Sequence, residues 1–339
     1  MDCNFTTNKI IFDYFSFTIK TDGYDITPED VISMLGLDGV NFIETYGSKG
    51  FRNRYYYDGV SIMFGGRDLI WCEMSGQGCR VYEQYGCCDW YGLSYQVLSD
   101  ERCHMTRLDI AYDDFNGLID IDKIYSDVQS GNWVSRCKKI RCETSFERDS
   151  RNGICITAGE KGSNISCRIY DKAAERGRSD EIPHWVRCEI QLRHEHSNNF
   201  LYYLLSDEKT LNGVEIDDNR RLDSLYFAVL NHFLRFIDKS ANNDSNVWRK
   251  PLAEHWQKFI DSYADLSVSL YKAPGTDYNL TRLVHNTIDM YGGMIYAYIQ
   301  IFGCDDLENS VDFKKFRLNK KYETLIETAR LQGVIKHGD

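Results

Sequence analysis

The segment Arg168-Ile-Tyr-Asp-Lys172 places a phenol between two cations at alternate positions. Ile165, Cys167 and Ile169 alternate with polar residues, which predicts a β-strand with Arg168 and Tyr170 on its polar face and Lys172 two residues beyond. A tyrosine attacks phosphorus poorly unless its proton is withdrawn and the phosphate charge is neutralised, and neighbouring cations assist both. Tyr170 is therefore a candidate nucleophile; an ordinary strand tyrosine is the alternative, since the chain has 23 tyrosines.

A second predicted strand, Arg107–Asp114, has two aspartates four residues apart on one face. Leu108, Ile110 and Tyr112 share one face, and Arg107, Asp109 and Asp113 share the other. Two bare carboxylates on one strand face repel each other unless a cation lies with them, and oxygen ligands suit a hard cation. Asp114 has a structural alternative as the cap of a turn at Asn116-Gly117, and the pattern leaves open whether Asp113 or Asp114 is the ligand.

A third strand, His184–Arg193, repeats the design with an acid between arginines. Val186, Cys188, Ile190 and Leu192 alternate with Arg187, Glu189, Gln191 and Arg193. If the three strands are neighbours, their polar faces form a single site of carboxylates, a tyrosine and cations.

Two other motifs are weaker signals. The turn Ser75-Gly-Gln-Gly-Cys-Arg80 lacks the glycine spacing of a phosphate-binding loop and indicates a tight strand-to-helix turn. The pair His194 and His196 sits where a strand gives way to a helix, which favours a surface cluster over a metal site.

Composition limits the class of protein. The 339 residues are 42% hydrophobic and have a formal net charge of −11, which argues against a protein that coats DNA non-specifically. The 12 cysteines include no C-x-x-C pair and indicate reduced thiols. We find neither an apolar run long enough for a membrane span nor a signal peptide, so we expect a cytoplasmic protein without membrane contact.

The remaining patterns predict an α+β fold, with an antiparallel sheet core flanked by helices and followed by a helical C-terminal part. Residues 10–19 form a strand with Ile11, Asp13, Phe15, Phe17 and Ile19 on one face, and residues 54–64 form a hairpin. From residue 197 the chain reads as helical, with an apolar stripe over 223–238 and helices near 252–263, 279–302 and 320–331. We expect a polar linker at 239–246 to divide a catalytic domain (1–240), which contains the three charged strands, from a helical accessory region (241–339) for DNA or partner contacts.

Four motifs in this order resemble the replication initiation factor (Rep_trans) family, which includes rolling-circle plasmid initiators and relaxases of conjugative elements. They are Ser75–Arg80, Arg107–Asp114, Cys167–Glu175 and Arg187–Arg193, and the resemblance extends over about residues 10–260. It implies an enzyme that nicks one DNA strand at an origin with a tyrosine nucleophile and a divalent metal.

Carried onto this chain, the resemblance implies Tyr170 as the nucleophile, which forms a 5′-phosphotyrosyl intermediate, and Mg²⁺ or Mn²⁺ held by Asp109, Asp113 and Glu189. Arg168 and Lys172 would stabilise the phosphoryl charge. Arg107, Arg187 and Arg193 would bind DNA. The implied partners are single-stranded or hairpin origin DNA, a host UvrD-like helicase and a second copy of the chain.

Two alternatives remain at this level. One is a non-catalytic DNA-binding protein of the same fold, and the other is a metal-dependent nuclease that uses water as its nucleophile.

Overall fold

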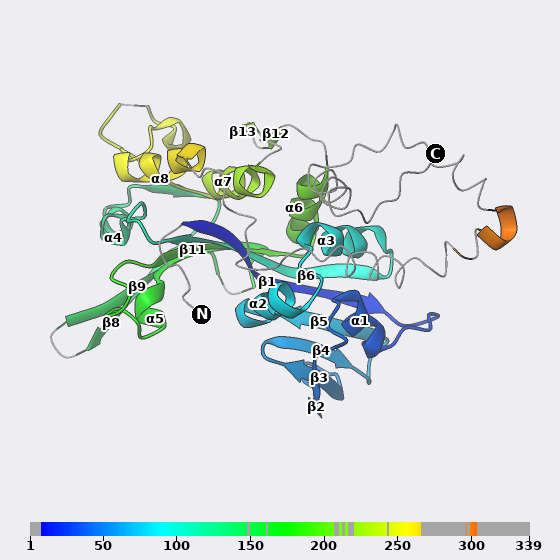
Figure 1. The fold of residues 1–339 in the computed structure, drawn as a ribbon. Coiled ribbons are helices and arrows are strands. Elements are labelled where there is room, and N and C mark those ends of the chain that lie inside the picture. Colours follow the sequence, from blue (N-terminus) through cyan, green and yellow to red (C-terminus); the bar gives the residue numbers. More distant parts are fainter. Residues whose placement is uncertain are drawn as a thin grey trace, which may run out of the picture. The chain divides into compact units, whose positions relative to one another are not determined.

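The computed structural model describes residues 8–147, 150–160, 162–206, 210–211, 214–215, 220–242, 244–265, 296 and 299–303. Its centre is a ten-stranded antiparallel sheet in the order β2-β3-β4-β5-β1-β6-β11-β10-β9-β8 (Figure 1). Its strands are β1 (Lys9–Lys20), β2 (Ile43–Tyr46), β3 (Asn53–Tyr57), β4 (Val60–Phe64), β5 (Leu69–Met74), β6 (Cys103–Asp114), β8 (Ile140–Glu147), β9 (Ser150–Ala158), β10 (Ile165–Asp171) and β11 (Val186–Arg193).

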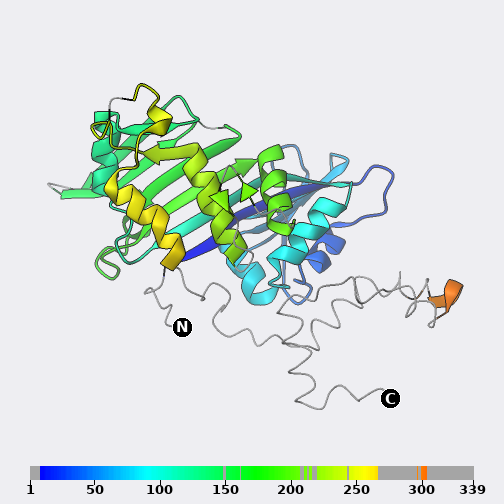
Figure 2. The same cartoon turned by 90° about the horizontal axis from the view of Figure 1, so that it is seen from above.

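Helices flank this sheet, and the predicted α+β class with an antiparallel core is confirmed. The helices are α1 (Pro28–Met34), α2 (Gly76–Tyr85), α3 (Trp90–Ser99), α4 (Ile121–Ser130), α5 (Lys172–Glu175), α6 (Glu195–Leu205), α7 (Arg221–Phe233), α8 (Glu254–Asp265) and the 3₁₀ turn η2 (Val247–Arg249). Two small sheets pair β7 (Trp133–Ser135) with β14 (Leu234–Phe236) and β12 (Thr210–Leu211) with β13 (Val214–Glu215). Figure 2 shows α6, α7 and α8 lying over the sheet.

The apolar faces of the central strands form the core against these helices. Tyr112 of β6 is fully buried, with its ring centroid 5.1 Å from that of Phe259 in α8. Tyr226 of α7 donates a hydrogen bond of 2.7 Å to the carbonyl of Cys188 in β11, which satisfies a buried hydroxyl. Because side chains alternate along a strand, burying this face turns the charged residues of β6, β10 and β11 to the opposite face.

The strand predicted at residues 10–19 forms, but its predicted facing is wrong. A β-bulge shifts the register between Phe12 and Tyr14, so Phe12 and Phe15 both enter the core and contact Trp90. Asp13 leaves that face and forms an ion pair with Arg187 of β11. An extra residue at a bulge breaks the period of two, and a charged side chain at Asp13 gains a partner by leaving the apolar layer.

The helix predicted over 223–238 is also shorter than expected. The helix α7 ends at Phe233, and the following three residues form β14, in which Leu234 and Phe236 are buried and Arg235 is half-buried. An apolar run this short is compatible with the period of a helix and with that of a strand. Residues 234–236 form a strand because they pair with β7.

Two compact units divide the chain, Met1–Tyr271 and Lys272–Asp339. The first includes α8, whose Trp256 and Phe259 are fully buried, so it extends past residue 240, the expected end of the catalytic domain. The functional boundary at 240 stays a prediction. In the second unit residues 299–302 are helical, while the helix predicted at 320–331 lies outside the described residues. None of the described helices is long and apolar enough to cross a bilayer.

Candidate active site

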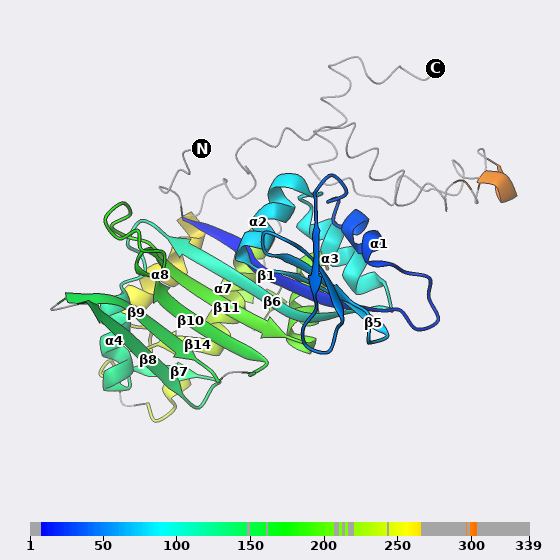
Figure 3. The same cartoon turned by 90° about the horizontal axis from the view of Figure 1, so that it is seen from below.

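The polar face is the face of the central sheet opposite α7 and α8, where Asp109, Tyr170 and Glu189 lie. Neighbouring strands β6, β11 and β10 bring the three predicted polar strand faces together here, as the period of two requires if they are adjacent. Figure 3 shows these strands from below, in front of α7 and α8. The directly opposed pairs are Arg168 with Glu189, Tyr170 with Arg187, Arg187 with Asp113, Gln191 with Asp109, and Arg193 with Arg107.

Tyr170 lies between an acid and two cations. Its hydroxyl donates to Oε2 of Glu189 at 3.2 Å and accepts from Nζ of Lys172 at 3.5 Å. The Arg168 guanidinium stacks over the phenol ring at 4.6 Å. Burial, together with the Glu189 charge, raises the pKa of Tyr170 above its ordinary value. The phenol is therefore protonated at neutral pH, with a proton acceptor already in contact.

The carboxyl group of Glu189 has a pKa close to neutral pH. Burial, followed by the charges of Asp109 and Asp13, raises the pKa of Glu189 to about 7. A carboxyl group with this pKa exchanges a proton near neutral pH, the property required of a general acid or base. Its other oxygen, Oε1, lies 3.8 Å from Arg168.

Lys172 reaches Tyr170 from a helix and not from the strand. The strand ends after Asp171, whose carboxylate accepts from the backbone N–H of Ala174 and caps α5. Lys172 is the first residue of α5 and forms an ion pair with Glu175. Burial and the nearby Arg187 lower the pKa of Lys172, so its ammonium group holds its proton less firmly than an exposed lysine does.

The predicted metal ligand Asp109 is in an ion pair with Arg107. Nε of Arg107 donates to both carboxylate oxygens, at 2.9 and 3.1 Å, and Gln191 donates at 3.5 Å. Asp109 is buried, and burial raises its pKa despite the Arg107 charge. Asp109 is diagonal to Glu189 in the register of β6 and β11, and its charge contributes to the raised pKa of that residue.

The predicted ligand Asp113 is in an ion pair with Arg187, and Asp114 caps a turn. Arg187 donates to the two oxygens of Asp113 at 2.7 and 2.8 Å, and the indole N–H of Trp185 donates at 2.8 Å. Asp114 instead accepts the backbone N–H groups of Asn116 and Ile119. The turn-capping alternative for Asp114 is thus the arrangement found.

The three arginines predicted to contact DNA differ in exposure. Arg187 is 5% exposed, and its guanidinium contacts Asp113 and, at 2.7 Å, Asp13. Arg107 and Arg193 are half-buried and face each other across β6 and β11. Arg193 donates to the side-chain oxygen of Gln191 at 3.2 Å. Sequence reasoning missed Asp13, because only the bulge in β1 turns it towards this face.

The residues fit a divalent cation at Glu189 and Asp109. Both carboxylates are buried, and the charge of Asp109 raises the pKa of Glu189, so a cation that neutralised them would stabilise their ionised forms. Within the described part of the chain, no three His, Cys, Asp or Glu side chains gather as a complete ligand set. Mg²⁺ commonly binds through one or two carboxylates, waters and substrate phosphate oxygens, so two carboxylates are a sufficient protein contribution.

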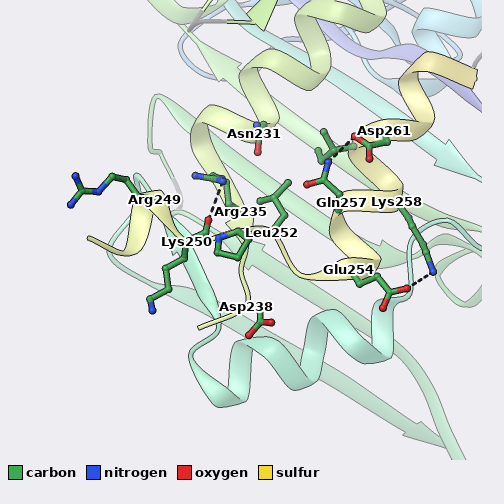
Figure 4. A pocket seen from close by; sticks show the side chains of 12 residues that line it. Asn231, Arg235, Asp238, Arg249, Lys250, Leu252, Glu254, Gln257, Lys258 and Asp261 are labelled. Carbon is green, nitrogen blue, oxygen red and sulfur yellow. Dashed lines mark hydrogen bonds and ion pairs between the residues drawn. The ribbon is translucent and has the colours of Figure 1, made fainter. Parts of the chain in front are cut away.

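A pocket elsewhere contains none of these residues. It lies among α7, β14, η2 and α8, in the helical layer, and Arg235, Leu252 and Gln257 line it (Figure 4). Arg235 donates there to the backbone carbonyl of Trp248. The predicted site is therefore on the polar face and not in this pocket.

Comparison with known proteins relates this chain to a protein family, a curated relative and a solved structure. The family model described as replication initiation factor (Rep_trans) matches residues 103–309. A protein of Bacillus subtilis (strain 168) described as "Putative DNA relaxase NicK" is 26% identical over 279 residues, which are 78% of this chain and 74% of that protein. A solved rolling circle replication initiator protein from Geobacillus stearothermophilus is 27% identical with a TM-score of 0.66, covering 77% of this chain and 98% of that one. The matched range 103–309 includes β6, β10 and β11, and thus every polar-face residue described above except Asp13.

Proposed function

This chain belongs to the replication initiation factor family, and we propose that it nicks one strand of origin DNA with Tyr170 as the nucleophile. The observation that carries the proposal is the contact of the Tyr170 hydroxyl with Glu189 and Lys172 on the polar face. The relatives are described as a DNA relaxase and a rolling circle replication initiator, and both descriptions agree with strand nicking.

In the proposed step, the Tyr170 oxygen attacks the scissile phosphorus. The new O–P bond forms as the bond from phosphorus to the 3′ oxygen breaks, which leaves a 5′-phosphotyrosyl enzyme and, after proton uptake from water, a free 3′-hydroxyl. The phenol proton passes to Oε2 of Glu189, which already accepts its hydrogen bond. Because the phosphodiester energy is retained in the tyrosyl ester, the strand can be rejoined.

In this proposal, Lys172 and Arg168 stabilise the negative charge that develops on the phenol oxygen and on the phosphate. Lys172 lies against the phenol oxygen and favours the phenolate as it forms. The Arg168 side chain is 42% exposed, so it can contact a phosphate oxygen without leaving the Tyr170 ring. Preorganised cations of this kind stabilise the negative charge that develops in the transition state.

Glu189 and Asp109 would hold the divalent cation, Mg²⁺ or Mn²⁺. When bound, such a cation polarises the phosphoryl oxygens and neutralises charge in the transition state. Asp109 and Asp113 each accept hydrogen bonds from an arginine, so either would have to give up part of that contact to bind the cation. The proposal assigns the cation to Glu189 and Asp109 because the charge of Asp109 acts directly on Glu189.

Arg107 and Arg193 are the arginines best placed to bind origin DNA, because both are partly exposed on this face. Arg187 is buried between the carboxylates of Asp113 and Asp13. In this proposal it neutralises their charge and does not contact DNA. A UvrD-like helicase and a second copy of the chain remain the predicted partners.

The test is a denaturing-gel assay for a covalent protein–DNA adduct with labelled hairpin oligonucleotides and Mn²⁺. We expect a metal-dependent adduct with the wild type and none with Tyr170→Phe. The matched control is Tyr46→Phe, which removes the hydroxyl of a tyrosine that is 95% exposed but lies far along the sheet in β2.

The possible results separate the candidate functions. An adduct that survives Tyr170→Phe would overturn the assignment of the nucleophile. Cleavage without any adduct would favour a nuclease that uses water, and DNA binding without cleavage on cognate origin DNA would favour the non-catalytic protein.

A further inference from the structure

In the described part of the chain, five aromatic rings on or beside the polar face have a cation stacked on them, and Tyr170 has a second one in Lys172. Arg168 stacks on Tyr170 and Arg107 stacks on Tyr14, at 4.6 and 4.0 Å. Towards the other edge of the sheet the pairs are Lys49 over Trp71, Arg54 over Tyr56 and Arg67 over Phe51, at 4.0, 4.9 and 5.3 Å. Such pairs occur roughly once per 70–80 residues in proteins, so five around one sheet face are a concentration.

Strand register places the distant pairs on the same face as the active site. Ser16 of β1 is opposite both Arg107 and Glu73, which puts Glu73 and Trp71 of β5 on the polar face. Trp71 is opposite Met63, which in turn is opposite Arg54. The face therefore continues without interruption from β10 to β3.

We propose that the β3–β5 end of this face, with Lys49, Arg54, Tyr56, Arg67 and Trp71, is a platform that binds single-stranded DNA next to the nicking site. The ring of Phe51 is buried and supports Arg67 from beneath. The inference rests on the proposed function, because Tyr170 then cuts the strand that the platform holds. Proteins that bind single strands without sequence preference combine basic grooves with aromatic rings on which bases stack. Arginine planes stack on bases in the same way.

The charges at this end suit a phosphate backbone. Within the described residues, neither Arg54 nor Arg67 has a carboxylate partner; Arg54 donates to the Thr45 hydroxyl at 3.0 Å. Two unpaired guanidiniums are notable in a chain whose net charge is −11, because most of its charge would repel DNA. A local cationic patch would attract the DNA backbone to the β3–β5 end, while the negative charge of the rest of the chain repels it.

Trp71 provides an independent observation. Its indole N–H is buried and has no hydrogen-bond acceptor in the described part of the chain. Leaving a buried donor unpaired costs free energy, and phosphate or base oxygens of a bound strand would supply the acceptor. Lys49 is half-exposed above the ring and forms an ion pair of 3.0 Å with Glu73. In the proposal a DNA phosphate replaces Glu73 and Trp71 as its partner, which uncovers the indole N–H.

The platform is within reach of the nicking site. The strands β5 and β10 are four neighbours apart, which is about 19 Å at the usual strand spacing. A single strand a few nucleotides long would span this distance, so one DNA molecule can occupy both.

The test measures the affinity of the full-length protein for oligodeoxythymidylates of about 4 to 16 nucleotides, the range of common single-strand site sizes. All proteins would contain Tyr170→Phe, so that covalent capture does not contribute. We expect the affinity of the parent Tyr170→Phe protein to rise with oligonucleotide length, and the added pair Arg54→Gln/Arg67→Gln to flatten that rise. The slope of log affinity against log salt should fall in magnitude by about 1.4, or about 0.7 for each phosphate that is no longer neutralised.

A second variant, Tyr56→Leu, tests stacking at an exposed ring and is expected to weaken the longest strand roughly five- to a hundredfold. The matched control is Arg136→Gln, which removes an arginine stacked on Trp248 outside the ten-stranded sheet and should change nothing. Unchanged length and salt dependence in the double variant would overturn the platform. The adduct assay reports separately on Tyr170, so either proposal can fail while the other stands.

Discussion

In the proposed reaction, the protonation state of Glu189 controls the chemistry of the polar face. Its carboxyl accepts the Tyr170 hydrogen bond, is diagonal to Asp109 and lies near Arg168. Burial and like charges raise its pKa to about 7, so the protonated and ionised forms are both populated at neutral pH. A group in this state can receive the phenol proton or bind a cation, and a cation would favour the ionised form.

Stability should fall as pH rises through the window between the ordinary pKa of Glu189 and about 7. In that window the folded protein holds a proton that the unfolded chain has released, so folding takes up protons and is weakened by raising the pH. We expect a difference of about 3 kcal/mol at most in the free energy of unfolding between about pH 5 and pH 8, measured with urea. In Glu189→Gln this part of the pH dependence should be missing; an identical pH dependence in the variant would contradict the assignment.

Activity should respond to pH in the opposite direction. Only the ionised Glu189 accepts a proton from Tyr170, so the initial rate of adduct formation should rise through about pH 7. Increasing Mn²⁺ should move this rise to lower pH, because a bound cation favours the carboxylate. A rate that is flat from about pH 5 to pH 8 would remove Glu189 as the proton acceptor.

At the scale of elements, Arg187 joins three strands. It projects from β11, donates twice to Asp113 of β6 and contacts Asp13 at the bulge of β1. All three side chains are partly or fully buried, so the ion pairs are poorly screened by water. The cluster fixes the order and register of the strands that present Asp109 and Glu189.

Replacing Arg187 should destabilise the fold. Arg187→Met keeps an unbranched side chain but leaves Asp113 and Asp13 without their cation, and we expect a loss of about 3–5 kcal/mol in the free energy of unfolding. The matched control is Arg193→Gln, on the same strand and face but without a carboxylate partner in the described residues, which should change stability by about 0.5 kcal/mol or less. Equal effects of the two substitutions in chemical denaturation would show that the Arg187 cluster has no special role.

At the scale of the whole molecule, the helix α8 belongs to the same compact unit as the polar face. Trp256 and Phe259 of α8 are fully buried, and Phe259 contacts Tyr112 on the core face of β6. The opposite face of β6 presents Asp109, so the packing of α8 supports the strand that positions the site.

Truncation should separate the compact unit from the expected domain boundary. A chain that ends after residue 271 keeps α8 and should unfold cooperatively and form the adduct. A chain that ends after residue 240 loses two buried aromatic side chains, each worth about 3–5 kcal/mol, which exceeds the margin of a typical domain. Circular dichroism during heating would compare them. A folded, active 1–240 fragment would restore the boundary predicted from sequence.

The amino-acid sequence alone was enough to predict which charged residues share the polar face. Alternation along Arg107–Asp114, Arg168–Lys172 and Arg187–Arg193 identified the charged faces, because a strand that buries its apolar residues must turn the others away from the core. The same pattern supported the α+β class, and the order of the motifs supported the family that the comparisons show.

How these components combine depends on the three-dimensional fold. Strand order is set by long-range pairing, which no local pattern contains, and it made β11 the neighbour of both β6 and β10. The bulge that brings Asp13 to Arg187 interrupts the period of two and is invisible to it. Pairing also engaged Asp113 with Arg187 and left Glu189 beside Tyr170, because each acid takes the partner that the register places opposite or diagonal to it.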